Sequence, residues 1–362
     1  MKEQVAMFWQ VSGRGGVEAM MARLALAFAD LEVRAKVLVI PKTGTVPEEV
    51  RKRLEVQELS VRHTGLALPW LARYLGREKP HALLAAKDRA NQVAVLAQKA
   101  AGSPCRLVLR VGTTPTAALK AKRLPKLWFT LPMRLLYPQA RWVAAVSSGV
   151  AQDLARLGIP EEKIRVVPNP VVSPRIHTLA DAPLSHPWLE DPLPVILGVG
   201  RLTPQKGFDV LLRSFAKMQA DTPARLLILG EGKERGRLLA LAKALGIAEK
   251  TQFLGHVDNP YPYFRRASLF VLSSFWEGSP NALTEALALG VPVVAADCPS
   301  GPREILRGGE VAPLVPVGDV DALAQAMRFS LHMPPAREKL MEAAIAFDAH
   351  ESAKRYLDLL LG

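Results

Sequence analysis

The sequence predicts an α/β protein made of two doubly wound, Rossmann-like domains, and three observations support this. Short β-branched segments alternate with helical patterns, which is typical of βαβ units and parallel sheets. The alternation stops over residues 168–194, a stretch with seven prolines, and then starts again. The length of 362 residues suits about two domains, each able to bury its own core.

The first half is expected to fold as one domain over residues 1–170. Its predicted strands are 5–11, 35–40, 81–85, 106–111, 142–146 and 163–167, with helices at 17–30 and 89–101 among others. Residues 171–194 are expected to be the linker that follows it, because they are rich in proline and show little periodicity.

A second domain is expected over residues 195–347. Its predicted strands are 195–199, 224–229, 251–254, 269–272 and 293–295, and its helices are 207–219, 233–245, 260–266 and 280–289. A last helical stretch, 335–361, has a break near Phe347, and the helix 348–362 is expected to pack back on the first domain. Two such domains would face each other across a cleft, with ligands bound at the carboxyl ends of the strands.

The net charge of +13 is carried by the first half alone. Residues 1–170 hold 27 Lys and Arg against 13 Asp and Glu, whereas residues 171–362 hold 20 against 21. Ten basic residues and no acidic residue lie between Arg89 and Gln152. Such a one-sided charge predicts an anionic partner, which could be nucleic acid, an anionic membrane or a phosphorylated substrate.

Other bulk features indicate a cytoplasmic protein. The N-terminus has no signal-peptide pattern, and no stretch reaches the roughly 18 apolar residues of a membrane-spanning helix. The two cysteines, Cys105 and Cys298, are too far apart to form a disulfide framework or a metal-binding spacing. We expect both to be small buried hydrophobic residues in a reducing compartment.

One segment, Glu277 to Leu287, has the pattern of an anion-binding helix start. It follows a predicted strand, with Ser279 expected as the N-cap and Pro280 as the first helical residue. The amide groups of the first turn, including those of Asn281 and Ala282, would then face an anion. Glu285 lies eight residues after Glu277, about 12 Å along a helix, which suits a grip on two ends of one elongated ligand. Taken alone, both carboxylates would be expected to be solvated surface charges.

A second segment, Gly200 to Asp209, follows the first strand of the second half. Two cations, Arg201 and Lys206, lie there between two glycines at the start of a helix. This arrangement is typical of a diphosphate clamp, although either cation alone would be expected to be a solvated charge.

Together the two segments read GRLxxxKGxD and EGxPNxxxEAxAxG, and this order resembles the GT-4 family of retaining glycosyltransferases, which have the GT-B fold. The likeness covers essentially the whole chain. Three further segments resemble the family: Gly15 to Glu18, Pro168 to Val171, and Asp297 to Leu306. The last of these is common in members that build envelope polysaccharides from UDP-sugars.

The resemblance implies roles for these residues. Arg201 and Lys206 would bind the donor diphosphate, Glu277 would face the transferred sugar, and Glu285 would accept hydrogen bonds from both ribose hydroxyls. The resemblance also places the following residues around the donor: Gly16, Gly278, Ser279, Asn281, Ala282, Leu254 and His256. His256 is expected to be a loop residue near the base rather than a catalyst. The family implies anomeric retention with no metal and no other cofactor, since a donor phosphate oxygen would deprotonate the acceptor.

The chain departs from the family at one point. Many members carry a histidine after the fourth strand of the first domain, and no histidine follows either candidate strand here. The donor sugar, which could be a hexose or an N-acetylhexosamine, therefore stays open. Asp88, Asn91 and Thr113 are the candidates for contact with a lipid-linked or envelope saccharide acceptor.

Several alternatives remain beside this interpretation. A dinucleotide-dependent oxidoreductase is disfavoured, because Glu18 stands where a third glycine is needed and no acidic residue ends the second strand. A nucleotide-sugar epimerase and a transferase with a small soluble acceptor stay open. A nucleic-acid-binding protein would explain the charge, but no helix-turn-helix, RNP or zinc motif supports it, so no nucleic acid is expected.

An anionic membrane is the partner that the basic segment 119–142 favours. Six cations there alternate with apolar residues that suit shallow insertion among headgroups. The cations are Lys120, Lys122, Arg123, Lys126, Arg134 and Arg141, and the apolar residues are Trp128, Phe129, Leu131 and Met133. Pro125, Pro132 and Pro138 are expected to break any long amphipathic helix. The predicted location is peripheral, at the inner face of the cell membrane.

Overall fold

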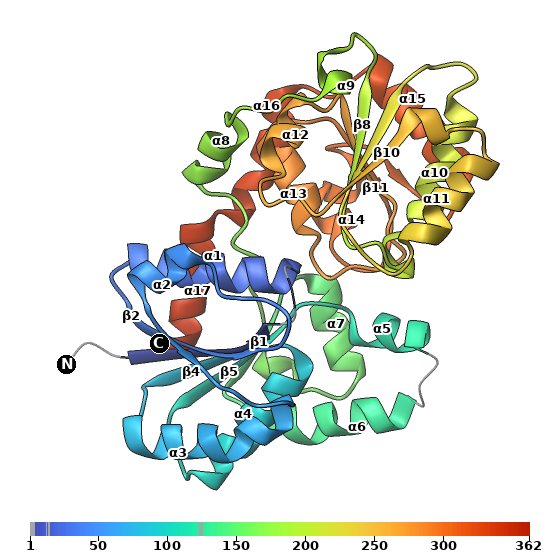
Figure 1. Cartoon of the computed structure of the whole chain (residues 1–362). Coiled ribbons are helices and arrows are strands. Elements are labelled where there is room, and N and C mark those ends of the chain that lie inside the picture. The colour runs from blue at the N-terminus through green and yellow to red at the C-terminus, as the bar shows by residue number, and fades with distance from the viewer. Residues whose placement is uncertain (1–3, 12, 14, 123–125) are drawn as a thin grey trace. The chain divides into compact units, whose positions relative to one another are not determined.

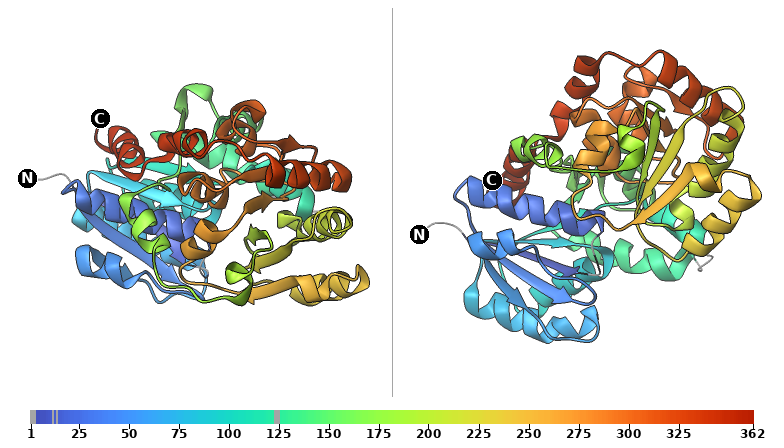
Figure 2. Two further views of the ribbon diagram at one scale, coloured as in Figure 1. Left: turned by 90° about the horizontal axis from the view of Figure 1, so that it is seen from above. Right: turned by 45° about the horizontal axis from the view of Figure 1, so that its top comes forward.

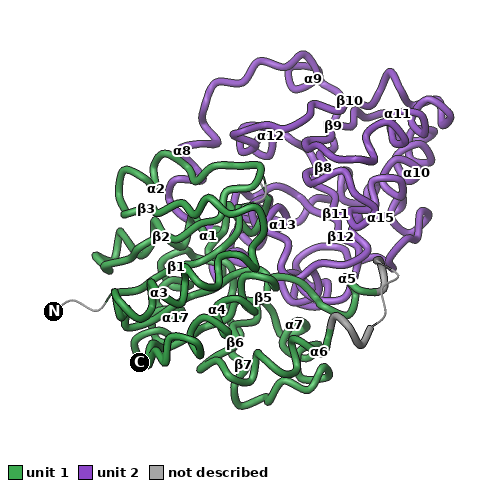
Figure 3. The backbone as a smooth tube through the Cα atoms, turned by 60° about the horizontal axis from the view of Figure 1, so that its bottom comes forward, with its two compact units in different colours: residues 1–171, 347–362 green, residues 172–346 purple. Residues whose placement is uncertain are grey.

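The computed structural model describes the chain apart from residues 1–3, 12, 14 and 123–125, and the side chains of residues 120–129 also lie outside the described part. The chain divides into two compact units (Figure 3). Unit 1 contains residues 1–171 and 347–362, and unit 2 contains residues 172–346.

Unit 1 is built on a parallel sheet in the order β3-β2-β1-β4-β5-β6-β7 (Figure 1). The strands are β1 (Gln4–Val11), β2 (Arg34–Pro41), β3 (Glu55–Glu58), β4 (Ala82–Ala86), β5 (Arg106–Val111), β6 (Trp142–Ala145) and β7 (Ile164–Val166). The helices are α1 (Gly16–Asp30), α2 (Glu48–Arg53), α3 (Leu68–Glu78), α4 (Asp88–Ala100), α5 (Pro115–Lys122), α6 (Lys126–Leu136), α7 (Ser148–Arg156) and α17 (Ala349–Leu361). Short 3-10 turns join them at Thr64–Ala67, Tyr137–Gln139 and Glu161–Lys163.

The central strands of unit 1 are apolar on both faces because helices cover both. On one face Phe8, Leu83 and Leu109 pack with residues of α3 and α4. On the other face alternate strand residues pack with α1 and α17. The two hydrophobic layers follow from the alternation of side chains along each strand.

The last helix, α17, completes the second face of this sheet. Asp348 caps it, since its carboxylate accepts hydrogen bonds from the amides of His350 and Glu351 at 2.9 and 3.0 Å. Its buried residues Ala353, Tyr356 and Leu360 pack into the same hydrophobic cluster as α1, and the two helices lie side by side (Figures 1 and 2).

Unit 2 has a parallel sheet in the order β10-β9-β8-β11-β12-β13. Its strands are β8 (Val195–Val199), β9 (Arg225–Leu229), β10 (Thr251–Gly255), β11 (Leu269–Leu272), β12 (Val293–Ala296) and β13 (Leu314–Val315). Its helices are α8 (Pro174–Ala180), α9 (Pro187–Glu190), α10 (Phe208–Met218), α11 (Arg235–Ala244), α12 (Tyr261–Arg266), α13 (Asn281–Ala288), α14 (Pro302–Ile305), α15 (Val320–His332) and α16 (Arg337–Ala344). Turns of 3-10 helix occur at Pro204–Lys206, Ala248–Lys250 and Arg307–Gly309, and Ile345–Phe347 forms another where the chain passes back to unit 1.

The proline-rich segment differs from the expected linker over residues 171–194. Residues 172–194 belong to unit 2, where Pro174 and Pro187 begin two short helices instead of preventing structure. The segment is also tied to its unit, since Asn259 donates to the carbonyl of Leu179 at 2.8 Å and His186 bonds Gln252 at 3.0 Å.

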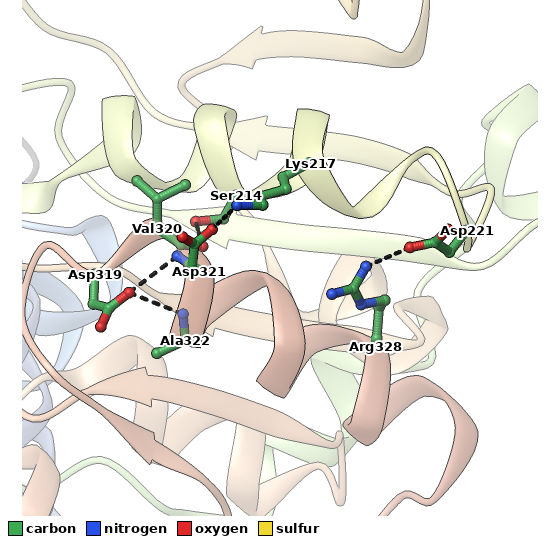
Figure 4. Close-up of polar contacts among 8 residues, drawn as sticks. All are labelled: Ser214, Lys217, Asp221, Asp319, Val320, Asp321, Ala322 and Arg328. Atoms are coloured by element: carbon green, nitrogen blue, oxygen red, sulfur yellow. Dashed lines mark hydrogen bonds and ion pairs between the residues drawn. The ribbon is translucent and has the colours of Figure 1, made fainter.

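Helices α10 and α15 cover one face of the unit 2 sheet and are joined by polar contacts at their rim (Figure 4). The buried Ser214 hydroxyl donates to the carbonyl of Val320 at 3.0 Å. Arg328 pairs with Asp221 at 2.6 Å, and Lys217 pairs with Asp321. Asp319 caps α15 by accepting from the amides of Asp321 and Ala322.

Both sheets therefore have the Rossmann strand order, and the predicted α/β fold of two doubly wound domains is confirmed. In unit 1, β1 and β4 are neighbours, and in unit 2, β8 and β11 are neighbours. The strand order reverses between these pairs, and the loops after them form the usual ligand site of such sheets. Within the described residues, no helix has both the length and the apolar character needed to cross a bilayer.

Candidate active site

The two loops that flank the switch point of unit 2 are fastened together. One follows β8 and ends at Gly207, and the other follows β11 from Ser273 to Pro280. The Phe275 amide donates to the Gln205 carbonyl at 2.8 Å, and the Gln205 side chain donates to the Trp276 carbonyl at 2.8 Å. These loops therefore form one preorganised structure.

Gly207 lies where the two loops approach each other closely. Its φ is +60°, and a Cβ atom at this position would lie 2.1 Å from the carbonyl oxygen of Ser273. Any larger residue would push the loops apart, so this glycine is required by the close approach.

Lys206 and Glu277 form an ion pair across these loops. The Lys206 Nζ lies 2.6 Å from the Glu277 Oε1, with the two side chains 17% and 8% exposed. The Ser274 hydroxyl donates to the same oxygen at 2.7 Å. The sequence suggested separate partners for Lys206 and Glu277, and the structure shows that the two residues also hold each other.

The charges of this ion pair influence the pKa of the Cys298 thiol. Burial raises the pKa of Cys298, and the negative charge of Glu277 raises it further while Lys206 opposes the shift. The thiol is therefore neutral at physiological pH and no nucleophile. Both cysteines are buried and free, as the sequence predicted.

Helix α13 carries the second glutamate of the pair. The structure corrects its start by one residue: Pro280 is the N-cap, and Asn281 is the first helical residue, so Ser279 is not the cap. The reason is that the Pro280 carbonyl already accepts from the amides of Leu283 and Thr284. Asn281 and Ala282 lie half-buried in the first turn.

Glu285 is only 7% exposed, so it is not a solvated helix residue. The Tyr261 hydroxyl at the start of α12 approaches its Oε1 at 3.4 Å. A buried carboxylate held in this way suits binding of a polar ligand group better than contact with bulk water.

The loop after β12 packs against the Gly278–Ser279 turn. Ser300 has a φ of +73° and donates from its hydroxyl to the Gly278 carbonyl at 2.9 Å. A Cβ atom on Gly301 would meet Pro280 at 2.7 Å. The Asp297–Leu306 segment thus shapes the turn that carries Gly278 and Ser279.

The remaining candidates of unit 2 lie at its surface. Arg201 is exposed in the loop after β8. Leu254 is half-buried in β10, and His256 is an exposed loop residue 3.2 Å from Asp258, as expected for it.

The unit 1 candidates lie at the carboxyl edge of its sheet. Gly16 is exposed as the first residue of α1, and Thr113 is exposed after β5. Asp88 begins α4 and accepts from the Tyr137 hydroxyl at 2.9 Å. Asn91 is 1% exposed and donates to the carbonyl of Arg110, which gives it a structural place within the unit.

Sequence reasoning missed several residues here. Ser274 and Tyr261 hold the two site carboxylates, and an ion pair of 2.5 Å joins Lys87 to Glu18 in unit 1. Ser274 could have been found, since it stands between the end of β11 and Glu277. Tyr261 lies 24 positions from Glu285, and Lys87 lies 69 positions from Glu18. No local sequence pattern indicates such contacts.

The described residues include no group of three or more His, Cys, Asp or Glu side chains arranged to hold a metal ion.

The fold and this site define a two-domain glycosyltransferase of the GT-B class. Residues 187–347 match the family described as glycosyl transferases group 1, and residues 15–170 match the glycosyl transferase 4-like domain. The chain belongs to this glycosyltransferase family.

Two relatives illustrate the membership. The N-acetylgalactosamine-N,N'-diacetylbacillosaminyl-diphospho-undecaprenol 4-alpha-N-acetylgalactosaminyltransferase of Campylobacter jejuni is 32% identical over 309 residues, which cover 82% of each chain. The lipopolysaccharide core biosynthesis glycosyltransferase LpsE of Rhizobium meliloti is 28% identical over 91% of this chain and 89% of its own.

Solved structures share the fold. HepE of Anabaena, crystallised in complex with UDP, superposes with a TM-score of 0.80 at 19% identity, over 98% of each chain. A glycosyltransferase of Rickettsia africae gives the same TM-score at 18% identity, over 99% of this chain and 98% of its own.

Proposed function

We propose that this glycosyltransferase moves a hexose or N-acetylhexosamine from a nucleotide diphosphate sugar, UDP-linked, to a lipid-linked or cell-envelope saccharide with retention of the anomeric configuration. The observation that carries the proposal is the buried Glu277, which pairs with Lys206 at the unit 2 switch point. It lies four residues before helix α13, which carries the buried Glu285. The relatives support the acceptor class, since one is named for a diphospho-undecaprenol-linked saccharide and another for lipopolysaccharide core biosynthesis. HepE, which was crystallised with UDP, supports the donor class.

In the proposed reaction, the residues of unit 2 bind and stabilise the donor. Arg201 and Lys206 offset the charge that develops on the departing diphosphate, which is the kind of stabilisation that lowers a barrier most. Glu285 accepts hydrogen bonds from the ribose hydroxyls, and Glu277 from those of the sugar. Gly278, Ser279, Asn281, Ala282, Leu254 and His256 complete the donor site of unit 2, and Gly16 is the donor-side candidate of unit 1.

No metal and no other cofactor takes part in this proposal. A phosphate oxygen of the donor takes the proton of the acceptor hydroxyl as that hydroxyl attacks the anomeric carbon. Asp88 and Thr113 remain the acceptor-side candidates at the unit 1 edge, and Asn91 would support them from the interior.

The test is a thermal-shift screen against UDP-, GDP- and ADP-sugars, followed by transfer assays with the donor that gives the largest rise in Tm. A ligand that binds only the folded state raises the melting temperature. The anomeric configuration of the product, measured by NMR, tests retention. Donor turnover to an isomeric nucleotide sugar without an acceptor would instead identify an epimerase, and transfer to free oligosaccharides would identify a soluble acceptor.

We also propose that unit 1 binds the anionic inner face of the cell membrane from the cytoplasm. Leu131 and Leu135 of α6 are 43% and 60% exposed, and Arg134 in the same helix and Arg141 just before β6 are also exposed. Two expectations about this segment are corrected: Met133 is 2% exposed, so it faces the core, and Pro132 lies inside α6 without ending it. The side chains of Lys120, Lys122, Arg123, Lys126, Trp128 and Phe129 lie outside the described part of the chain.

Co-sedimentation with anionic and neutral vesicles tests the membrane proposal across a salt series. Each basic residue near an anionic surface contributes about 1 kcal/mol, and screening weakens this as salt rises. Reversal of Lys120, Lys122, Arg123 and Lys126 to Glu should abolish binding. Reversal of the four exposed cations Arg51, Lys52, Arg53 and Arg62 is the matched control and should weaken binding less. Equal binding by the two variants would rule out this face, and salt-sensitive binding to nucleic acid would revive that partner.

A further inference from the structure

Ser274 stands at the base of the candidate site without reaching its surface. It follows β11, its exposed fraction is 0%, and its hydroxyl donates to the Glu277 Oε1 at 2.7 Å. A residue so deeply buried cannot touch a sugar or a phosphate directly. Any effect on the reaction must therefore pass through Glu277.

The Glu277 Oε1 receives two hydrogen bonds from two different loops. The ammonium of Lys206 approaches from the loop after β8 at 2.6 Å, and the Ser274 hydroxyl approaches from the loop after β11. Hydrogen bonds to a charged acceptor are shorter and about twice as strong as those between neutral groups. The last torsion of a glutamate side chain has a broad energy well, so a single contact leaves the carboxylate free to swing. Two donors at this one oxygen fix the plane of the Glu277 carboxylate.

The frame that carries these donors is itself rigid. The hydroxyl of the neighbouring Ser273 donates to the Lys206 carbonyl at 2.9 Å, and the close approach at Gly207 locks the loops. Ser274 therefore has a fixed position from which to orient Glu277.

We propose that Ser274 is the positioning residue for Glu277, which it holds in the orientation that meets the transferred sugar; this inference rests on the function proposed above. Lys206 supplies the countercharge to the Glu277 carboxylate, and Ser274 fixes the orientation of that carboxylate. The two contributions are separable, because a serine hydroxyl carries no charge.

Ser274→Ala removes the hydroxyl with almost no change in volume. We expect its turnover number to fall by about 10- to 100-fold, the scale on which a displaced catalytic group acts. Its affinity for UDP should stay within about twofold of wild type, because the nucleotide contacts assigned to Glu285 are intact. Its affinity for the UDP-sugar that gives the largest thermal shift should fall relative to that for UDP, since only the sugar meets Glu277.

The matched control is Ser214→Ala. Ser214 is also 0% exposed and also loses one hydrogen bond, to the Val320 carbonyl between α10 and α15 (Figure 4). Both variants should lose some thermal stability, and Ser274→Ala should lose more, because its hydrogen-bond acceptor is charged. Only Ser274→Ala should lose turnover.

A second comparison uses Glu277→Ala as the background. If Ser274 acts through Glu277, adding Ser274→Ala to Glu277→Ala should change the residual turnover by less than about twofold, because interacting residues are not additive. Wild-type turnover in Ser274→Ala, equal losses of UDP and UDP-sugar affinity, or a full further loss in the double variant would each overturn the inference. A wild-type protein that binds no nucleotide sugar would instead overturn the proposed function.

Discussion

Each of the two units places a lysine–glutamate ion pair between the loops at its switch point. In unit 2, Lys206 follows the first strand and Glu277 follows the fourth. In unit 1 the residue types are exchanged, because Glu18 lies in the first turn of α1 after β1 and Lys87 follows β4. The side chains are partly shielded in both, at 23% and 13% exposed in unit 1. The same topology thus brings opposite charges together twice.

The units differ in how the backbone accommodates the pair. In unit 2 a glycine, Gly207, takes the left-handed conformation next to Lys206. In unit 1 the ion-paired lysine itself is strained, since Lys87 has a φ of 78° and a ψ of 140°. Non-glycine residues rarely adopt such angles, at a cost of about 1–3 kcal/mol. The positive φ angle thus falls on the ion-paired lysine itself in unit 1, but on the glycine next to the lysine in unit 2.

The largest effect is expected for the unit 2 pair. Glu277→Ala should lower turnover by about 10²- to 10³-fold, as for loss of a preorganised electrostatic group. Lys206→Ala should lower turnover similarly and also destabilise the fold by about 3 kcal/mol, because it leaves a buried carboxylate without its cation. Steady-state kinetics and urea unfolding of both variants measure this. Wild-type stability of Lys206→Ala would show that the ion pair contributes nothing to folding.

Arg201→Ala provides the contrast within unit 2. Arg201 is exposed, so its removal should leave the unfolding free energy within about 0.5 kcal/mol of wild type. Turnover should still fall by about tenfold or more if the guanidinium offsets charge on the diphosphate. An unchanged turnover would remove Arg201 from the site.

Glu285→Ala should act on binding rather than on turnover. Loss of two hydrogen bonds to a ribose should weaken UDP binding by about 1–3 kcal/mol, or about 5- to 150-fold. Tyr261→Phe should show a smaller loss in the same direction, since its hydroxyl approaches Glu285. Isothermal titration with UDP measures both, and unchanged UDP affinity in Glu285→Ala would exclude the ribose contact.

The strain in unit 1 predicts an unusual order of stability. Lys87→Gly should be more stable than Lys87→Ala by about 1 kcal/mol, because both lose the ion pair but only glycine relieves the backbone. Lys79 has a φ of 44° and a ψ of 55° at the end of α3, inside the ordinary left-handed region. The difference in stability between Lys79→Gly and Lys79→Ala should therefore be smaller. Thermal unfolding of the four variants measures this, and a Lys87→Ala protein as stable as Lys87→Gly would refute the strain.

The smallest effect is expected from metal removal. The proposed chemistry relies on Arg201 and Lys206, so dialysis against a chelator should leave transferase turnover within experimental error. Recovery of lost activity on adding Mg²⁺ or Mn²⁺ would overturn this part of the proposal.

Much of the fold could be predicted from the sequence because it rests on local signals. Most strands of both sheets are apolar runs bounded by turn residues, and the sequence predicts β8 with both ends correct. The sequence does not predict β3, which is mostly polar and not buried, or the two-residue strand β13, which is too short to show periodicity. The prediction of a linker over residues 171–194 was wrong, because it relied on proline content. In a sequence, a proline at the first position of a helix cannot be distinguished from a proline in a loop.

The site was predicted in its residues but not in its contacts. Lys206 and Glu277 are 71 positions apart, and only the sheet order brings them together. Arg110 shows the same limit, since it was counted with the basic residues of the first half. The structure buries it beside Asn169, at 2.7 Å, and burial lowers the pKa of its guanidinium. Charge counting cannot distinguish such a buried cation from a surface one.

Helix α17 has a consequence for the order in which this protein is made. Unit 2 is continuous, from residue 172 to residue 346, whereas unit 1 needs residues 347–362 to cover one face of its sheet. During translation the strands of unit 1 emerge first, yet the helix that shields them emerges after the whole of unit 2. Unit 2 can therefore fold as one continuous segment, whereas β4 and β5 of unit 1 lack part of their cover until α17 has been synthesised. The half that is synthesised first is the half that is completed last.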